Sequence, residues 1–318
     1  MSSCIFCVPG NTKQQQDFTI VIFQLFRAMK DKVVISLSSI PPRFKDLGKV
    51  LKCLLDQDHQ ADEIQLFIPR YYRRFPQHAF APPPEVPPGV ALRIVDEDLG
   101  PATKVLYCAR EHWGTETQII YCDDDRLPER DWLKSFVSAA EKSPDKAIVS
   151  TGWHLTRYGI HTSNERLPRA VKLRVMEDYA YMGGRINQKL KEFIFRKPHK
   201  KPSRINCRKP GYIDIAAGYG GVLIKPEFFD KNAFDIPPIV WTVDDVWLSG
   251  LLELKGIGIW QDNSIRVPIN ISDIGTAGLG GSVIEDYDRD AANKLAIRYF
   301  QDNHSIWKES RLPIQGKN

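Results

Sequence analysis

Apolar residues alternate between short β-branched runs and helical spacings through the first half of the chain. The run Val-Val-Ile-Ser-Leu-Ser-Ser at 33–39 predicts a strand, which the prolines at 41–42 end. Apolar positions at helical spacing follow from Phe44 to Asp56. The pattern then continues, with strands expected at 63–68, 90–95, 118–122 and 147–150 and helices at 101–111 and 131–141. This alternation predicts an α/β fold with helices on the faces of a sheet.

The second half of the chain has a different pattern. Residues 185–209 contain ten Lys or Arg and a single acid, Glu192, which favours an insertion or a solvated, flexible loop. The alternative is that this charge attracts an anionic molecule, such as a phosphorylated lipid or an acidic polysaccharide. An apolar stretch with several glycines runs from Tyr212 to Ile224, and helices are expected at 242–254 and 286–300. We therefore expect one domain with a decorated C-terminal half. The expected parts are an extension at 1–30, a domain at 31–300 whose halves are 31–150 and 151–300, and a tail at 301–318.

Composition narrows the class of protein. The chain has 318 residues, of which 42% are hydrophobic and 26% charged, and this excludes wholesale disorder, collagen and a small disulfide scaffold. Its 44 basic and 39 acidic residues give a net charge of +5, too even to indicate nucleic-acid binding. The six cysteines are scattered apart from Cys4-x-x-Cys7, so we expect free thiols and a cytoplasmic location. The apolar run Phe18–Phe26 is too short to span a membrane, and we expect the extension to pack on the domain or lie on a membrane surface.

Three consecutive carboxylates, Asp123, Asp124 and Asp125, follow the strand expected at 118–122. Along a continuing strand Asp123 and Asp125 would point to one face and Asp124 to the other. Two carboxylates on one side form a hard-oxygen site for Mg²⁺ or Mn²⁺, with open positions for phosphate oxygens. The competing interpretation is an exposed acidic turn.

A second acidic pair, Asp244 and Asp245, begins the helix expected at 242–254. A carboxylate at this position can act as a general base if it faces a substrate hydroxyl. Helix capping is the alternative, because Thr242 and Asp245 have the spacing of a capping box.

Two weaker features complete the set. The glycines in Gly218-Tyr219-Gly220-Gly221 favour close approach of a ligand to the backbone, although a bulge or turn explains them equally well. Lys104 lies one turn into the helix that opens at Leu99-Gly100-Pro101, where its ammonium could reach a phosphate or a sugar.

The order of these motifs resembles the GT-A-fold glycosyltransferases, in particular the family 2-like inverting enzymes, from about Val33 to Gly258. The resemblance rests on the acidic triplet as a DxD element, the glycine cluster and the distal Asp pair. It implies a Rossmann-like, mixed but mostly parallel sheet. It also implies a hexosyltransferase-type enzyme that uses Mn²⁺ or Mg²⁺.

The same resemblance implies a role for each candidate residue. Asp123 and Asp125 would bind the metal, and Asp245 would be the base with Asp244 beside it, although which of the two acids is the base stays open. Donor contacts would come from Ser36, Ser38, Arg43, Lys104, Asp123 and Asp124, and acceptor contacts from Tyr219, Gly220, Gly221 and Trp247. The expected donor is a UDP-sugar, and the acceptor a sugar, a glycan or a lipid-linked molecule.

Two other functions stay open. A nucleotidyltransferase would also use acids and Mg²⁺, but it normally has a glycine-rich loop after the first strand, and Ser36–Arg43 contains no glycine. A non-catalytic nucleotide-sugar-binding protein could share the fold, because function depends on the site. Such a binder would have no need of the distal acids.

Overall fold

The computed structural model describes residues 32–78, 81–271 and 289–309. The described residues from Val33 onward belong to one compact unit. The expected extension at 1–30, with Cys4 and Cys7, lies outside the described residues, as does the second half of the expected tail, 310–318. The predicted division into halves at residue 150 stays a prediction.

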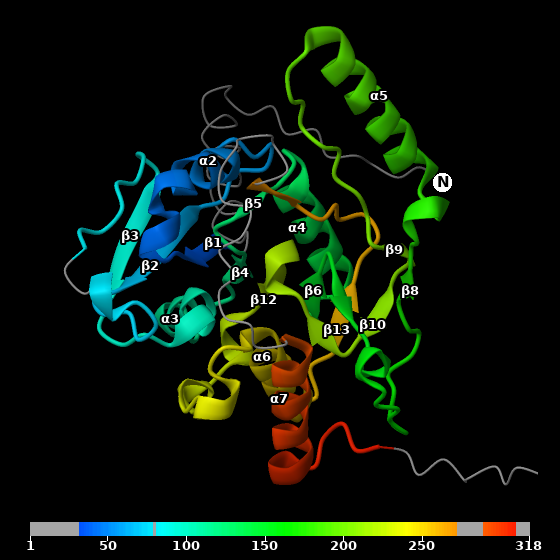
Figure 1. The fold of residues 1–318 in the computed structure, drawn as a ribbon. Helices are drawn as coiled ribbons and strands as arrows, with labels where there is room; N and C mark the ends of the chain where they lie inside the picture. Colours follow the sequence, from blue (N-terminus) through cyan, green and yellow to red (C-terminus); the bar gives the residue numbers. More distant parts are fainter. Residues whose placement is uncertain (1–31, 79–80, 272–288, 310–318) are drawn as a thin grey trace, which may run out of the picture. The chain divides into compact units, whose positions relative to one another are not determined.

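An eight-stranded sheet forms the centre of the described unit (Figure 1). Within it β10 and β12 run antiparallel to their neighbours, and every other adjacent pair is parallel. The predicted mixed, mostly parallel sheet is therefore confirmed. Across the sheet the order is β10 (Gly211–Ile213), β13 (Ile259–Gln261), β6 (Ala147–Val149), β12 (Val222–Ile224), β4 (Gln118–Tyr121), β1 (Val33–Ser38), β2 (Glu63–Pro69) and β3 (Val90–Val95).

Helices α2 (Phe44–Leu55) and α4 (Trp132–Lys142) cover one face of this sheet (Figure 1). The buried positions of α2 recur every three or four residues, from Leu47 to Leu54, because only one side of the helix meets the strands. These side chains join Ile35 of β1 and Phe136 of α4 in one apolar cluster.

Helices α3 (Thr103–Glu111), α6 (Asp244–Leu254) and α7 (Arg289–His304) belong to the opposite face. A second apolar cluster lies on this face. Val34, the neighbour of Ile35 on β1, belongs to it, because successive side chains along a strand point to opposite faces. Val105 of α3 and Phe300 of α7 are completely buried there. The two clusters hold β1 and β4 from both sides, so their carboxyl ends are fixed in position.

Short strand pairs and 3₁₀ turns connect these elements. The paired short strands are β5 (Arg126–Leu127) with β14 (Ile269–Asn270), β7 (Gly152–Trp153) with β11 (Ile215–Ala216), and β8 (Val171–Lys172) with β9 (Cys207–Lys209). The 3₁₀ turns are η1 (Pro41–Arg43), η2 (Pro76–His78), η3 (Gly100–Ala102), η4 (Leu155–Tyr158), η5 (Val175–Glu177), η6 (Gly218–Gly220), η7 (Pro226–Phe228), η8 (Lys231–Phe234) and η9 (Pro238–Val240).

The predicted elements of the first half agree with the structure to within about two residues. In the second half, the helix expected at 286–300 runs from Arg289 to His304 in the described residues. The predicted domain end at residue 300 therefore lies inside α7.

The largest difference concerns the basic segment 185–209, where an insertion or flexible loop was predicted. Helix α5 (Tyr179–Phe195) occupies the first part of this segment and β9 its end. Among the many charged residues, apolar residues recur every three or four positions, which is the spacing of a helix. They are Tyr179, Met182, Ile186, Leu190 and Phe193.

The described cysteines, Cys53, Cys108, Cys122 and Cys207, are free thiols. Among the described helices, none is both long and apolar enough to cross a bilayer.

Candidate active site

A cavity of about 530 Å³ opens where the carboxyl ends of β1 and β4 meet the first turn of α6. Open α/β sheets bind ligands at this edge, because the loops that follow parallel strands gather there. Asp123, Asp125 and Asp245 all line the cavity, although more than a hundred positions separate the first two from the third. The predicted convergence of the two acidic motifs is confirmed.

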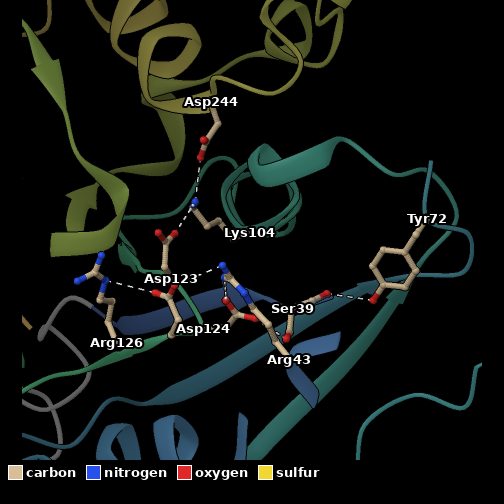
Figure 2. Close-up of polar contacts among 9 residues, drawn as sticks. Ser39, Arg43, Tyr72, Lys104, Asp123, Asp124, Arg126 and Asp244 are labelled. Atoms are coloured by element: carbon tan, nitrogen blue, oxygen red, sulfur yellow. Dashed lines mark hydrogen bonds and ion pairs between the residues drawn. The ribbon is translucent and has the colours of Figure 1, made fainter. Parts of the chain in front are cut away.

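Lys104 connects these motifs (Figure 2). Its Nζ lies 2.8 Å from Asp123 Oδ1 and 2.8 Å from Asp244 Oδ2. Burial disfavours the ammonium, but the carboxylates of Asp123, Asp244 and Asp245 outweigh it and raise the pKa of Lys104 well above its usual value. Burial likewise opposes ionisation of Asp123, and Lys104 overcomes it, so that the pKa of Asp123 is lowered. Both groups are therefore charged at neutral pH.

Asp124 organises the loop that follows β1. It accepts a hydrogen bond from Ser39 Oγ and pairs with Arg43, whose Nη1 lies 2.5 Å from Asp124 Oδ1. Tyr72 donates to the Ser39 carbonyl at 3.0 Å and holds the loop from the other side (Figure 2). Burial alone would lower the pKa of Arg43, but the negative charges of Asp124 and Asp125 have the larger effect, so the pKa of Arg43 is raised.

The prediction that Asp124 points away from Asp123 and Asp125 is wrong. All three side chains reach the cavity, because β4 ends at Tyr121 and strand alternation does not continue into the turn.

Asp245 is partly buried at the first turn of α6. Its Oδ1 accepts a hydrogen bond from the Gly218 amide at 2.8 Å, and Ser249 Oγ donates to its backbone carbonyl at 2.6 Å. Burial and the neighbouring Asp244 carboxylate raise the pKa of Asp245 to about 8. The structure shows no side-chain cap at this helix start, so the capping-box interpretation of Thr242 and Asp245 is wrong.

Asp125 has the character of a cation ligand. Its Oδ1 is buried without a hydrogen-bond partner, 3.3 Å from Arg126 Nε, and Arg43 Nη2 lies 3.3 Å from Oδ2. The described residues contain no cluster of three His, Cys, Asp or Glu placed to hold a metal. Mg²⁺ and Mn²⁺ bound together with a diphosphate need only one or two protein carboxylates, so Asp125 and the partly exposed Asp123 fit such an ion.

Other predicted residues also line the cavity. Ser38 and Tyr219 do so, and the Arg126 guanidinium stacks on the Tyr219 ring at 4.6 Å. This pair places a cation and an aromatic surface on the same wall.

Four residues that were predicted to contact the donor or the acceptor do not line the cavity. Ser36 is fully buried, and its Oγ donates to the Lys104 carbonyl at 2.5 Å, so it anchors α3 on β1. Trp247 is only 4% exposed, and its indole donates to the Ala233 carbonyl and packs on Phe300. The prediction that Trp247 contacts the acceptor is wrong, because the apolar face of α6 points into the core.

Gly220 and Gly221 are also structural. They belong to a tight turn that begins with η6 rather than to a glycine strand. A Cβ on Gly221, whose φ is +90°, would lie 2.4 Å from the Trp132 ring, and one on Gly220 would lie 2.4 Å from Ser150 Oγ. Gly218 serves the site instead, through the amide that binds Asp245.

Sequence reasoning missed a further part of the cavity lining. It contains three aromatic residues and three polar ones: Trp153, Tyr158, Trp241, Arg157, Asp290 and Asn293. These residues come from short or irregular segments and from the start of α7, which carry no recognisable motif. Tyr72 could have been found, because it follows the end of β2 at the same sheet edge.

Comparisons with known proteins give partial structural likenesses. S. aureus TarS, residues 1–349, is 10% identical over 76% of this chain and 60% of that structure, with a TM-score of 0.42. Its complex with UDP-GlcNAc is 10% identical over 74% of this chain and 57% of that one, with a TM-score of 0.39. The mannosyltransferase PcManGT from Pyrobaculum calidifontis, in complex with GDP-Man and Mn²⁺, is 16% identical over 78% and 63%, with a TM-score of 0.40.

No protein-family model matches the sequence, and no curated protein matches it either. The chain spans about three fifths of the length of the structures that it resembles.

Proposed function

We propose that the chain is a glycosyltransferase that moves a sugar from a nucleotide-sugar donor to an acceptor hydroxyl, with inversion at the anomeric carbon. One observation carries the proposal: acids from 123–125 and 244–245 meet around Lys104 in a single cavity. The first group suits a diphosphate with its cation, and the second suits deprotonation of a hydroxyl. A protein that only binds nucleotide-sugars would not need the second group.

The donor half would lie between the loop after β1 and the acidic triplet. Ser38 and Ser39 line this part of the cavity, and Arg43 and Arg126 bring two guanidinium groups to it. Guanidinium groups bind phosphate oxygens in a bidentate manner and offset the charge that grows on a departing diphosphate. A divalent cation held by Asp125 and Asp123 would neutralise part of the same charge. We infer a UDP-sugar as the donor.

Asp245 would act as the general base. A base whose pKa is near the working pH removes a proton most effectively, and the pKa of Asp245, about 8, meets this condition. The Gly218 amide fixes one carboxyl oxygen of Asp245 and so orients the side chain. Asp244 pairs with Lys104 and would position the acceptor, which we infer to be a sugar, a glycan or a lipid-linked molecule.

Three aromatic residues of the cavity lining support binding of an acceptor sugar. Trp153, Tyr158 and Tyr219 line the cavity together with polar side chains from α7. Sugar rings pack their C–H faces on aromatic rings while their hydroxyls bind polar groups, and the cavity lining offers both.

A panel of nucleotide-sugars incubated with Mn²⁺ tests the proposal by release of nucleoside diphosphate. We expect turnover of one donor, its loss on chelation, and a decrease of about 100-fold or more in Asp125→Ala. Asp302→Ala, on the exposed side of α7, is the matched control and should retain activity. Binding of a donor without any turnover would identify a binding protein, and no binding of any donor would refute both functions.

A further inference from the structure

Helix α5 carries its apolar residues on the outside. Tyr179, Ile186, Leu190 and Phe193 are spaced by seven, four and three residues, so they form one stripe along the helix. Their exposed fractions are 81%, 69%, 54% and 82%. Met176, just before the helix, is 73% exposed and extends the apolar surface.

The opposite side of α5, which faces the protein, is polar. Gln188 is the buried residue of this helix, and its amide donates to the His199 carbonyl at 2.8 Å. Glu192 accepts from the His199 amide, and the Arg204 guanidinium stacks on the Tyr181 ring at 5.5 Å. A surface helix normally buries its apolar stripe against the core, so the polarity of α5 is the reverse of the usual one. In Figure 1, α5 extends away from the sheet.

Exposed cations lie on α5 and in the segment that follows it: Lys189, Lys191, Arg196, Lys197 and Lys200, of which Lys200 pairs with Glu129 at 3.1 Å. The acid of this segment, Glu192, binds Lys189 at 2.8 Å, so its charge is already compensated. The exposed surface therefore combines bulky apolar side chains with an excess of positive charge.

We propose that α5 and the basic segment that follows it, residues 179–201, bind the surface of a membrane rich in anionic lipids. The apolar stripe would enter the boundary between headgroups and acyl chains, and the lysines would contact the anionic headgroups. The helix would lie in the plane of the membrane, because its 17 residues carry charge on both flanks and do not qualify as a spanning segment. Pairing of two α5 helices in a dimer is disfavoured, since it would bring like charges together.

Co-sedimentation with vesicles tests this surface in the full chain. The vesicles are phosphatidylcholine alone or a 7:3 mixture of phosphatidylcholine and phosphatidylglycerol. We expect binding to the anionic vesicles, weaker binding in high salt, and little binding to neutral ones. Replacing the stripe by serine (Ile186→Ser, Leu190→Ser and Phe193→Ser together) should lower the partition coefficient about 100-fold.

A second variant tests the charge. Lys191→Gln with Lys197→Gln should weaken binding to anionic vesicles about 30-fold, because each lysine near such a surface contributes a factor of about five. The matched control, Lys134→Gln with Lys142→Gln on α4, changes the same net charge elsewhere and should bind like the wild type. Far-ultraviolet circular dichroism establishes that each variant is folded.

Three results would overturn the proposal. The wild type could fail to bind anionic vesicles. The serine variant could bind as well as the wild type, which would place the contact in another segment. Light scattering could also show that the wild type is a dimer that binds no vesicles and that the serine variant is a monomer. The apolar stripe would then contact a second copy of the chain instead of a membrane. None of these results depends on the proposed sugar transfer.

Discussion

Asp245 combines burial, a neighbouring carboxylate and a backbone donor within one side chain. The first two disfavour its charge and the Gly218 amide favours it, with the result that its pKa rises to about 8. Asp244, one residue earlier, faces Lys104 instead. Two adjacent acids in one helical turn therefore have different environments, which suits one to proton transfer and the other to positioning.

The two acids should respond differently to substitution. We expect Asp245→Asn to lower kcat by about 10²- to 10⁴-fold while the Kd for the donor stays within a few-fold of the wild type. Asp244→Asn should mainly raise the KM for the acceptor. Steady-state kinetics and donor titration by calorimetry separate these effects. Normal turnover in Asp245→Asn with loss of activity in Asp244→Asn would reverse the assignment.

The pH profile follows from the same carboxylate. Only the ionised form of Asp245 can accept a proton, so kcat/KM should rise about tenfold per pH unit below pH 8 and level off above it. Initial rates between pH 6 and 9 give this profile. A flat profile from pH 6 to 8 would exclude Asp245 as the base in the free enzyme.

Stability should depend on pH through Asp245 as well. Its folded pKa is above the ordinary value of 3.8, so between about pH 4 and 8 the folded state holds a proton that the unfolded state has lost. The wild type loses this stability as pH rises through the window, whereas Asp245→Asn does not. The Tm of the variant relative to the wild type should increase by about 5 °C or more from pH 5 to pH 8. A constant difference in Tm would contradict the raised pKa.

At the scale of elements, Lys104 joins three segments that are distant in the sequence. It belongs to α3, and its ammonium contacts Asp123 after β4 and Asp244 at the start of α6. The Ser36 hydroxyl on β1 donates a hydrogen bond to the Lys104 carbonyl. The positions of α3 and α6 relative to the sheet are therefore coupled through one buried cation.

Replacing Lys104 by methionine should destabilise the fold by about 3 kcal/mol at pH 7, since it leaves the partly buried carboxylates of Asp123 and Asp244 without their counter-charge. The loss should shrink as pH falls, because Lys104 lowers the pKa of Asp123 and protonation of the acids removes the repulsion. Urea unfolding at pH 7 and pH 4 measures both values. Lys134→Met, on the exposed side of α4, is the control and should stay within about 0.5 kcal/mol of the wild type. An equal loss in the two variants would contradict the structural role of Lys104.

At the scale of the whole molecule, the cavity is assembled from segments between Ser38 and Asn293. A ligand that fills it contacts α3, α6, α7 and the loops at the sheet edge, so binding should stabilise the unit as a whole. A saturating nucleoside diphosphate with Mn²⁺, at about 100 times its Kd, adds about 2.7 kcal/mol. In a domain of this size we expect a rise in Tm of about 5 °C.

Differential scanning fluorimetry measures this rise. A chelator or the Asp125→Ala substitution should abolish most of it, and the nucleoside without phosphates should produce little of it. A full rise in the presence of a chelator would show that the diphosphate binds through Arg43, Arg126 and Lys104 without a cation.

Much of the architecture was readable in the sequence because it is local. The run at 33–39 is rich in β-branched and apolar residues, and the spacing from Leu47 to Leu54 matches one side of a helix, so strand and helix follow from short-range patterns. The acids that follow β4 and begin α6 could also be recognised as site candidates from local sequence. Each acid adjoins an element whose end could be located.

Tertiary structure decided which of those residues face the cavity and what charge they carry. Trp247 and Ser36 are recognisable types at expected positions, yet packing directs both into the core, and no local pattern distinguishes the two sides of an apolar helix such as α6. The pKa of Asp245 depends on burial by distant elements and on Lys104, 141 positions earlier in the chain. Periodicity reports where an element begins and ends, whereas burial and charge pairing arise only when segments remote in sequence are packed together.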